Sequence, residues 1–283
     1  MLEVETPRGR FHCLVEGPPD GPLALCLHGF PDVPHGMAGV QGALAARGHR
    51  AVAPFLRGYA PSVLDGPHDL SALGEDVVAL VDALSPSRPA SVVGHDWGAV
   101  AAYVALARAP GRFCRAVTMA VPHPYVFARD VARHPGQLAR SWYMLAVQPS
   151  AGGWLLARRD HALVDRLVRA WSPGWTPEPR HLSRVKACLA ESGDAPLALY
   201  RALLRPLAGA RRRLAELRAM RISTPLLYLH GERDGCVGAA LGEGNARMFD
   251  GPHERRVLAG LGHFLHMEAP LAVEAMIVEH LSR

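Results

Sequence analysis

The stretch Val92-Val93-Gly94-His95-Asp96-Trp97-Gly98 joins an apolar, strand-like run to a helical pattern, and it decides what fold we expect. A nucleophile flanked at a spacing of two by small residues is typical of the sharp strand-to-helix elbow that presents a side chain above a parallel sheet. Glycine suits positions 94 and 98, because a Cβ there would obstruct the close approach of strand and helix. The nucleophile position holds Asp96. The plainer interpretation of the stretch alone is a glycine-rich turn in which this aspartate caps the helix.

Apolar runs and helical patterns alternate on both sides of this elbow, as in a parallel sheet covered by helices. The clearest helix is predicted over Leu70–Leu84, where leucines and valines share one face and Glu75, Asp76 and Asp82 are expected to face water. Two further helices are predicted over 99–109 and 271–281. The runs that predict buried strands are residues 23–27, 51–53, 91–93, 116–120, 225–229 and 255–258.

The pattern changes after Pro122-His123-Pro124, where strand-like runs stop and tryptophans appear among arginine-rich helical stretches broken by prolines. Strand-like sequence returns near residue 225. We therefore expect a core domain formed by residues 1–124 and 220–283, interrupted by a helical cap domain over residues 125–219.

Composition predicts an ordinary globular protein, with 49% hydrophobic and 20% charged residues in a chain of 283. The net charge of +5 does not indicate a nucleic-acid partner, because the arginines are scattered and the one cluster, Arg211–Arg213, precedes apolar residues at helical spacing. Residues 1–10 carry four charges and do not resemble a secretory signal, and no apolar run reaches membrane-spanning length. We expect a cytoplasmic protein that does not insert into a membrane. Its five cysteines are widely spaced and predict neither a zinc site nor a redox dithiol.

Three polar residues follow predicted strands in the order nucleophile, acid, histidine: Asp96, Asp234 and His263. Side chains at the carboxyl ends of parallel strands converge on one edge of the sheet, and this order is that of the α/β-hydrolase triad. Glu232 and His266 are the neighbouring rivals for the acid and the histidine.

The segment His28-Gly29-Phe30-Pro31-Asp32 follows the first clear strand, where such a fold places an anion-binding loop beside the elbow. The backbone N–H groups of Phe30 and Trp97 are therefore predicted to hold an oxyanion. A carboxylate nucleophile needs no deprotonation and is suited to attack an sp3 carbon that bears a leaving group. The product would be an ester on Asp96, which water activated by His263 then hydrolyses.

Four segments together resemble the epoxide hydrolase branch of the α/β-hydrolase superfamily, and the resemblance covers nearly the full chain: His28-Gly29-Phe30-Pro31, Arg57-Gly58-Tyr59, Gly94-His95-Asp96-Trp97-Gly98 and Gly262-His263-Phe264. The resemblance implies a mostly parallel sheet flanked by helices, with an inserted helical cap, and cofactor-independent hydrolysis of an epoxide to a vicinal diol. It also implies a cis bond before Pro31, and it leaves Tyr59 as a structural residue.

Members of this branch carry two cap tyrosines that protonate the epoxide oxygen. The resemblance assigns this role to Tyr143, in Ser141-Trp142-Tyr143 before Gln148-Pro149, and to Tyr200, in Leu199-Tyr200-Arg201. Phenol O–H donors lower the cost of expelling an alkoxide. The side chains of Phe30, Trp97 and Met144 are expected to line an apolar substrate pocket.

Other functions remain open at this point. A haloalkane dehalogenase shares the aspartate elbow but usually has asparagine where this chain has Phe30, and fluoroacetate dehalogenases carry arginines just after the nucleophile, where this chain has Trp97 and Gly98. A non-catalytic small-molecule binder is a third alternative. The histidines lack metal-ligand spacing, so neither a metal nor another cofactor is expected. The natural epoxide, the ring carbon attacked and the oligomeric state, with a homodimer among the alternatives, are not determined by the sequence.

Overall fold

The computed structural model describes residues 1–149, 151–204 and 209–283, and it contains one eight-stranded sheet in the order β1-β2-β4-β3-β5-β6-β7-β8. Strands β1 and β2 run antiparallel to their neighbours, whereas all the other pairs are parallel. The strands are β1 (Leu2–Thr6), β2 (Gly9–Glu16), β3 (Leu23–Leu27), β4 (Arg50–Pro54), β5 (Ala90–His95), β6 (Phe113–Met119), β7 (Leu226–Gly231) and β8 (His253–Leu258).

All six predicted strands are present, because β3, β4, β5 and β7 are almost wholly buried and read as continuous apolar runs. The sequence did not predict β1 and β2. These two strands bury only alternate side chains, Val4 in one and Phe11 and Cys13 in the other, between charged and exposed residues. Such short half-buried strands give a weak periodic signal.

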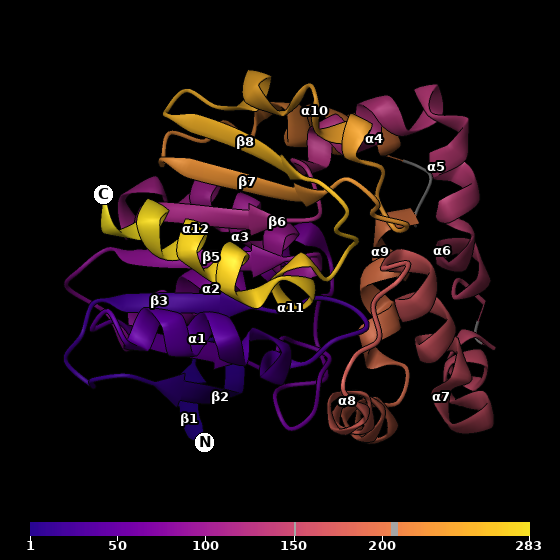
Figure 1. Ribbon diagram of the computed structural model, residues 1–283, viewed down its shortest axis with the longest axis horizontal. Coiled ribbons are helices and arrows are strands. Elements are labelled where there is room, and N and C mark those ends of the chain that lie inside the picture. The colour runs from indigo at the N-terminus through magenta and orange to yellow at the C-terminus, as the bar shows by residue number, and fades with distance from the viewer. Residues whose placement is uncertain (150, 205–208) are drawn as a thin grey trace.

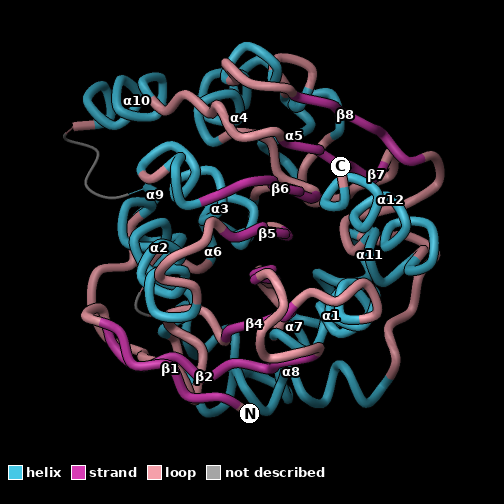
Figure 2. The backbone as a smooth tube through the Cα atoms, turned by 90° about the vertical axis from the view of Figure 1, so that its left-hand side faces the viewer, coloured by secondary structure: helices cyan, strands magenta, loops and turns pink. Residues whose placement is uncertain are grey.

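Two layers of helices cover the sheet (Figure 2). Helices α1 (Ala38–Ala45) and α12 (Pro270–Ser282) pack together on one face, beside the short α11 (Leu265–Glu268). Helices α2 (Leu70–Leu84) and α3 (Trp97–Arg108) pack together on the other face. Each face has its own apolar core, so the sheet is buried on both sides, as the α/β pattern predicted.

Between β6 and β7 the described residues form helices, which lie beyond the carboxyl ends of the strands (Figure 1). They are α4 (Pro124–Asp130), α5 (Pro135–Arg140), α6 (Trp142–Ala146), α7 (Gly152–Trp171), α8 (Pro179–Ser192), α9 (Ala198–Leu204) and α10 (Ala210–Ala219). The backbone of α7 leaves the helical conformation at Arg158–His161. The elements agree with the expected helical insertion, while its status as a separate cap domain over 125–219 stays a prediction.

Helix α2 has the predicted bounds, but one of its acidic residues does not face water. Asp76 is buried, and its carboxylate accepts hydrogen bonds from Arg57 Nε and Nη2, at 2.7 and 2.8 Å, and from Arg8 Nε at 2.6 Å. The expectation for Asp76 was wrong, because the loop with Arg57 and the β1–β2 hairpin cover that side of the helix. Helical periodicity alone cannot reveal a partner that is distant in the sequence.

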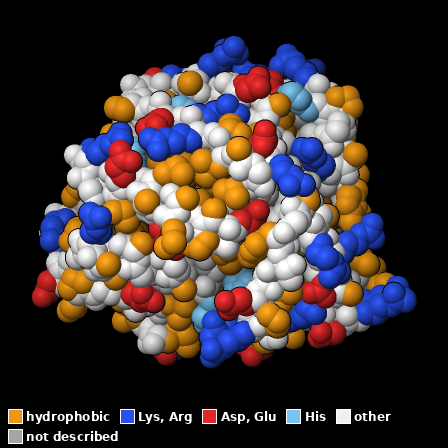
Figure 3. Space-filling view, viewed as in Figure 1, with side chains coloured by type: hydrophobic (Ala, Val, Ile, Leu, Met, Phe, Trp, Pro, Cys, Tyr) orange, Lys and Arg blue, Asp and Glu red, His pale blue; other side chains and the backbone are white. Residues whose placement is uncertain are grey.

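The face shown in Figure 3 carries charges of both signs interspersed with apolar side chains. Within the described part of the chain, none of the helices combines the length and the apolarity needed to span a bilayer.

Candidate active site

Asp96 occupies a sharp turn between β5 and α3, with a backbone φ of +51° that non-glycine residues seldom adopt. The two flanking glycines make this turn sterically accessible. A Cβ on Gly94 would lie 2.4 Å from the carbonyl oxygen of Gly98, and a Cβ on Gly98 would lie 2.2 Å from that of Leu27. The turn therefore has the geometry of the predicted elbow.

The loop after β3 reaches back to this aspartate. The backbone N–H of Phe30 donates a 2.8 Å hydrogen bond to Asp96 Oδ1, and the peptide bond between Phe30 and Pro31 is cis, as the resemblance implied. Trp97 is the first residue of α3, where a backbone N–H has no carbonyl partner within the helix. Both predicted oxyanion donors thus belong to segments that meet at Asp96, although their role in a reaction stays a prediction.

The two other members of the predicted triad lie beside the elbow. His263 Nδ1 is 2.8 Å from Asp234 Oδ2, and His263 Nε2 is 3.6 Å from Asp96 Oδ2. Asp234 is held in turn by the backbone N–H groups of Cys236 and Val237, which donate to its Oδ1 at 2.7 and 2.9 Å. Its carboxylate can therefore orient the imidazole without turning itself.

The rival acid and histidine are placed elsewhere. Glu232 is exposed, and its Oε2 accepts a hydrogen bond from the N–H of Gly260. His266 is buried, with its ring 4.6 Å from the ring of His95, and is not hydrogen-bonded to Asp234. The geometry brings Asp234 and His263 to Asp96 and leaves both rivals aside, while the catalytic roles of these residues stay a prediction.

Charge interactions shift the pKa values of His263 and Asp96. Burial by itself would lower the pKa of His263, but the charge and hydrogen bond of Asp234, together with Asp96, raise that pKa to about 10. Burial by itself would raise the pKa of Asp96, but the attraction of His263, with Nε2 3.6 Å from Oδ2, holds that pKa below the usual value instead. Both shifts favour the charged forms of His263 and Asp96 at neutral pH.

A largely apolar cavity of about 290 Å³ opens above Asp96. Tyr143 and Tyr200 both line it, and their rings meet edge to face with centroids 5.5 Å apart. Burial raises the pKa of both phenols well above the ordinary value, so both keep their protons at neutral pH. The cavity is lined by Leu70, Asp96, Trp97, Val100, Val121, Pro124, Phe127, Ala128, Val131, Tyr143, Met144, Tyr200, Leu203, Leu217, Cys236 and Val237.

Trp97 and Met144 line this cavity as expected, whereas Phe30 does not. The Phe30 ring is buried and packs edge-on against Tyr200, with centroids 5.4 Å apart, so it supports a lining residue without belonging to the lining. Its backbone faces Asp96, which explains why one residue can supply an oxyanion donor and still leave its side chain outside the pocket.

Two residues at the site were missed by sequence reasoning. Cys236 lines the cavity, and its Sγ lies 3.5 Å from the hydroxyl of Tyr143. Gln137 of α5 is buried, donates to the carbonyl oxygen of Cys236 at 2.7 Å and accepts from the N–H of Gly238 at 2.9 Å. The position of Cys236 just after Asp234 could have suggested its place, but no signal in the sequence pairs Gln137 with that loop.

Asp32, at the end of the loop after β3, contacts helix α8 of the insertion between β6 and β7. Its Oδ1 lies 2.9 Å from Nε2 of His181 on α8, and this carboxylate raises the pKa of His181 although burial opposes the shift. Ligand-type atoms of Asp32, His95 and His266 lie within 4.8 Å of one another behind the triad. This buried cluster supports the elbow from below and does not line the cavity.

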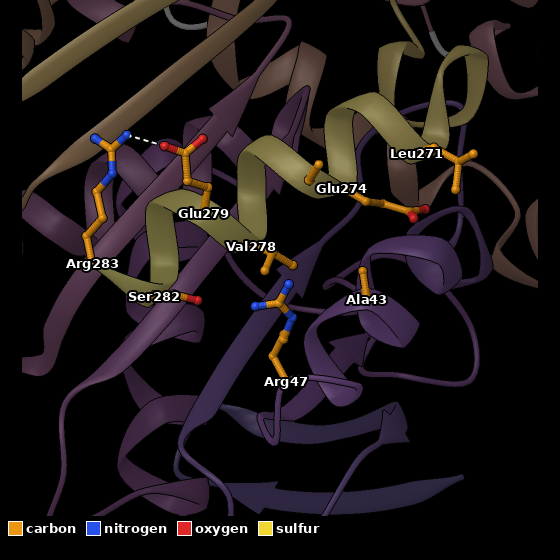
Figure 4. Close-up of a pocket in the computed structure, with 9 residues that line it drawn as sticks. Ala43, Arg47, Leu271, Glu274, Val278, Glu279, Ser282 and Arg283 are labelled. Carbon is orange, nitrogen blue, oxygen red and sulfur yellow. Dashed lines mark hydrogen bonds and ion pairs between the residues drawn. The ribbon is translucent and has the colours of Figure 1, made fainter.

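A larger hollow of about 540 Å³ lies at the surface between α1 and α12 and shares no lining residue with the cavity above Asp96 (Figure 4). Arg47, Glu274, Glu279 and Arg283 project around it, and the last two are hydrogen-bonded at 2.6 Å. Its described lining offers neither a histidine nor a cysteine. The predicted nucleophile, Asp96, lies in the smaller cavity and not in this hollow.

Comparison with known proteins identifies the family. The sequence pattern of the family described as alpha/beta hydrolase fold matches residues 22–270. Epoxide hydrolase 3 of Mus musculus is 30% identical, covering 92% of this chain and 71% of that protein. Epoxide hydrolase 3 of Xenopus tropicalis is 29% identical, covering 96% of this chain and 74% of that protein.

Solved structures show the same fold. A Bacillus megaterium epoxide hydrolase bound to an inhibitor superposes with a TM-score of 0.85 at 21% identity and full coverage of both chains. Epoxide hydrolase A of Mycobacterium thermoresistibile gives a TM-score of 0.82 at 23% identity, covering 99% of this chain and 98% of the other. At these identities the likeness establishes the α/β-hydrolase fold.

Proposed function

The chain belongs to the epoxide hydrolase branch of the α/β-hydrolase superfamily, and from this premise we propose that it hydrolyses an epoxide to a vicinal diol through a covalent ester on Asp96. Residues 125–219 serve in this proposal as the cap over a core of 1–124 and 220–283. Water is the second substrate, and the reaction needs no cofactor.

One observation carries the proposal: an ionised carboxylate and two protonated phenols line the same apolar cavity. Epoxide opening needs a nucleophile at carbon and an acid at oxygen at the same moment. A serine nucleophile would need a base, and a halide leaving group would need no acid. The combination of Asp96, Tyr143 and Tyr200 therefore fits an epoxide better than an ester or an alkyl halide.

In the first step, Asp96 Oδ2 attacks one ring carbon and the C–O bond to the ring oxygen breaks. Oδ1 is held by the N–H of Phe30, which leaves Oδ2 as the free nucleophilic oxygen. The departing oxygen takes a proton from Tyr143 or Tyr200. Ester formation removes the negative charge of Asp96, one of the interactions that raise the pKa of His263, so the imidazolium can release the proton that restores the phenol.

In the second step, neutral His263 takes a proton from water, and the hydroxide attacks the carboxyl carbon of Asp96. Asp234 stabilises the imidazolium that forms, through the 2.8 Å hydrogen bond to Nδ1. The N–H groups of Phe30 and Trp97 stabilise the tetrahedral oxyanion, a contribution of about 2.7–4 kcal/mol for each donor in comparable sites. Collapse releases the diol with an original aspartate oxygen.

This origin of the oxygen supplies the test. Under single turnover with styrene oxide in heavy-oxygen water, the first diol should be unlabelled and the peptide containing Asp96 should carry the label. Asp96→Ala should give no diol. Label in the first diol would show direct attack by water and refute the ester. Halide release from chloroalkanes without any diol from epoxides would favour a dehalogenase, and binding without turnover of either class would favour a binder.

The tyrosines have a separate test. Tyr143→Phe and Tyr200→Phe should each slow ring opening by roughly 10²-fold, and the double variant should nearly abolish it, because each hydroxyl stabilises the developing alkoxide. Tyr125→Phe, on α4 and outside the cavity lining, is the matched control and should keep normal turnover. Full activity in the double variant would refute the assignment.

A further inference from the structure

We propose that Asp96, Cys236 and His263 form a binding site for a thiophilic divalent cation such as Zn²⁺ or Cd²⁺, and that the bound ion blocks this active site. One ligand-type atom from each of these three residues lies within 4.8 Å of the other two. All three side chains are buried, and the cavity above Asp96 gives access to them. The ion is an inhibitor in this proposal and takes no part in the reaction.

The distances fit a tetrahedral ion with a small adjustment. Zinc bonds of about 2.0–2.1 Å to nitrogen or oxygen and about 2.3 Å to sulfur separate two ligand atoms by roughly 3.3–3.6 Å. His263 Nε2 and Asp96 Oδ2 are already 3.6 Å apart. The sulfur of Cys236 lies within 4.8 Å of these two atoms and has to approach them by up to about 1 Å to reach that separation.

The loop after β7 aims the sulfur at this point. The N–H of Cys236 donates to Asp234 Oδ1 and its carbonyl oxygen accepts from Gln137, so the backbone is held from both sides. The neighbouring Tyr143 hydroxyl, 3.5 Å from Sγ, and the cavity leave the fourth coordination position to water. An open fourth position is usual for zinc held by three side chains in an enzyme cavity.

The existing contacts of His263 also suit a metal ligand. A histidine that binds zinc through one ring nitrogen commonly donates the other N–H to a carboxylate, which fixes its orientation and increases its basicity. The 2.8 Å hydrogen bond between His263 Nδ1 and Asp234 Oδ2 has this form. Nε2 has no hydrogen-bond partner within 3.5 Å among the described residues.

Thiolate and imidazole ligands favour zinc and softer ions over magnesium or calcium. Binding replaces the thiol proton of Cys236 and the Nε2 proton of His263, so two protons pass to solvent for each ion bound. The carboxylate of Asp96 then binds the doubly charged ion directly, while Asp234 holds the imidazole through Nδ1, on the side away from the ion. Occupation of Asp96 Oδ2 and His263 Nε2 removes both the nucleophile and the base.

Cys236 lines the cavity above Asp96, whereas the other four cysteines do not. Cys13 and Cys26 are buried within the sheet, and Cys188 lies against the Ala60 carbonyl and the Ser192 hydroxyl. Cys114 is exposed. We therefore expect Cys114 to be the one competing thiol accessible to a metal probe, and it should be removed first.

The experiment uses the full chain with Cys114→Ser as parent. Cd²⁺ is titrated into the parent and into versions that also carry Cys236→Ser, Cys236→Ala or the control Cys188→Ser, with affinity followed by the ultraviolet cadmium–thiolate absorption and by calorimetry. Both Cys236 variants should lose the absorption band and weaken binding by about 100-fold or more, because even outer-shell changes cost 10–100-fold. Cys188→Ser should bind as the parent does, and thermal melting verifies that each variant is folded.

Blocking of turnover rests on the proposed function, whereas metal binding does not. Inhibition of styrene oxide hydrolysis should follow the cadmium titration, and a chelator should reverse it. An unchanged absorption band in both Cys236 variants would overturn the site. Binding that depends on Cys236 in a protein without epoxide activity would uphold the site and refute only the proposed reaction.

Discussion

The most informative perturbation is Asp234→Asn, because the two carboxylate oxygens of Asp234 have different hydrogen-bond partners. Oδ1 accepts two backbone hydrogen bonds, and Oδ2 accepts the proton on His263 Nδ1. In the asparagine variant the amide oxygen keeps the backbone bonds, so its NH₂ group points at the imidazole. The histidine must then accept at Nδ1 and carry its proton on Nε2, which faces Asp96 and can no longer take a proton from water.

The magnitude follows from the two-step scheme. Asp234 contributes the largest of the interactions that raise the pKa of His263 to about 10, so its neutralisation lowers that pKa as well as changing the tautomer. The equivalent change in a serine protease triad lowers turnover by roughly 10⁴-fold. Here the loss should fall on ester hydrolysis, because Asp96 remains an ionised nucleophile and the phenols are untouched.

Rapid-quench kinetics with styrene oxide and mass analysis of the Asp96 peptide measure the two steps separately. The variant should consume one epoxide per active site with a near-normal burst and then accumulate the ester. Glu232→Gln, two residues away and exposed, is the matched control and should turn over normally. A variant that turns over slowly without accumulating ester, or a control that loses as much activity, would refute the assignment of Asp234.

Three further outcomes test the fold and its charges. The raised pKa of His263 stabilises the fold fully below about pH 6.5, and this stabilisation is lost as the pH rises towards 10. The free energy of unfolding, measured in urea, should therefore fall between these pH values more in the parent protein than in His263→Gln. Asp76→Ala leaves the buried Arg57 without its carboxylate partner and should lower the free energy of unfolding by about 3–5 kcal/mol, measured by thermal denaturation. Asp82→Ala, at an exposed ion pair, should lower it by less than about 1 kcal/mol. Gly98→Ala places a Cβ 2.2 Å from the carbonyl oxygen of Leu27 in β3 and should lower the free energy of unfolding by about 3 kcal/mol or more. A Cβ at Gly111 meets no atom within 4 Å, so Gly111→Ala should change the free energy of unfolding little.

The sequence predicted the parallel core well because four of its strands, β3, β4, β5 and β7, are almost wholly buried. A run such as Leu23–Leu27 has no exposed side, so hydrophobicity alone marks it. The elbow at Asp96 was equally readable, since only glycine tolerates the carbonyl contacts at positions 94 and 98. The order of Asp96, Asp234 and His263 followed from strand ends that meet at one edge of a parallel sheet.

Side-chain partners between distant segments were not readable in the same way. Asp76 occupies a helix position that periodicity assigns to water, yet the loop containing Arg57 folds over it. Phe30 contacts Asp96 through its backbone N–H and Tyr200 through its ring. The identity of the residue alone does not reveal which of these parts lies at the site.

By itself, then, the sequence determined the fold and predicted the nucleophile and the order of the triad residues, because these depend on local periodicity and on backbone sterics. Only the tertiary structure shows that Asp96 and Asp234 flank His263 and raise its pKa, and that Cys236 lines the cavity together with Asp96. The physical reason is that pKa values and ligand geometry depend on distances of a few ångströms between side chains that come from separate segments of the chain.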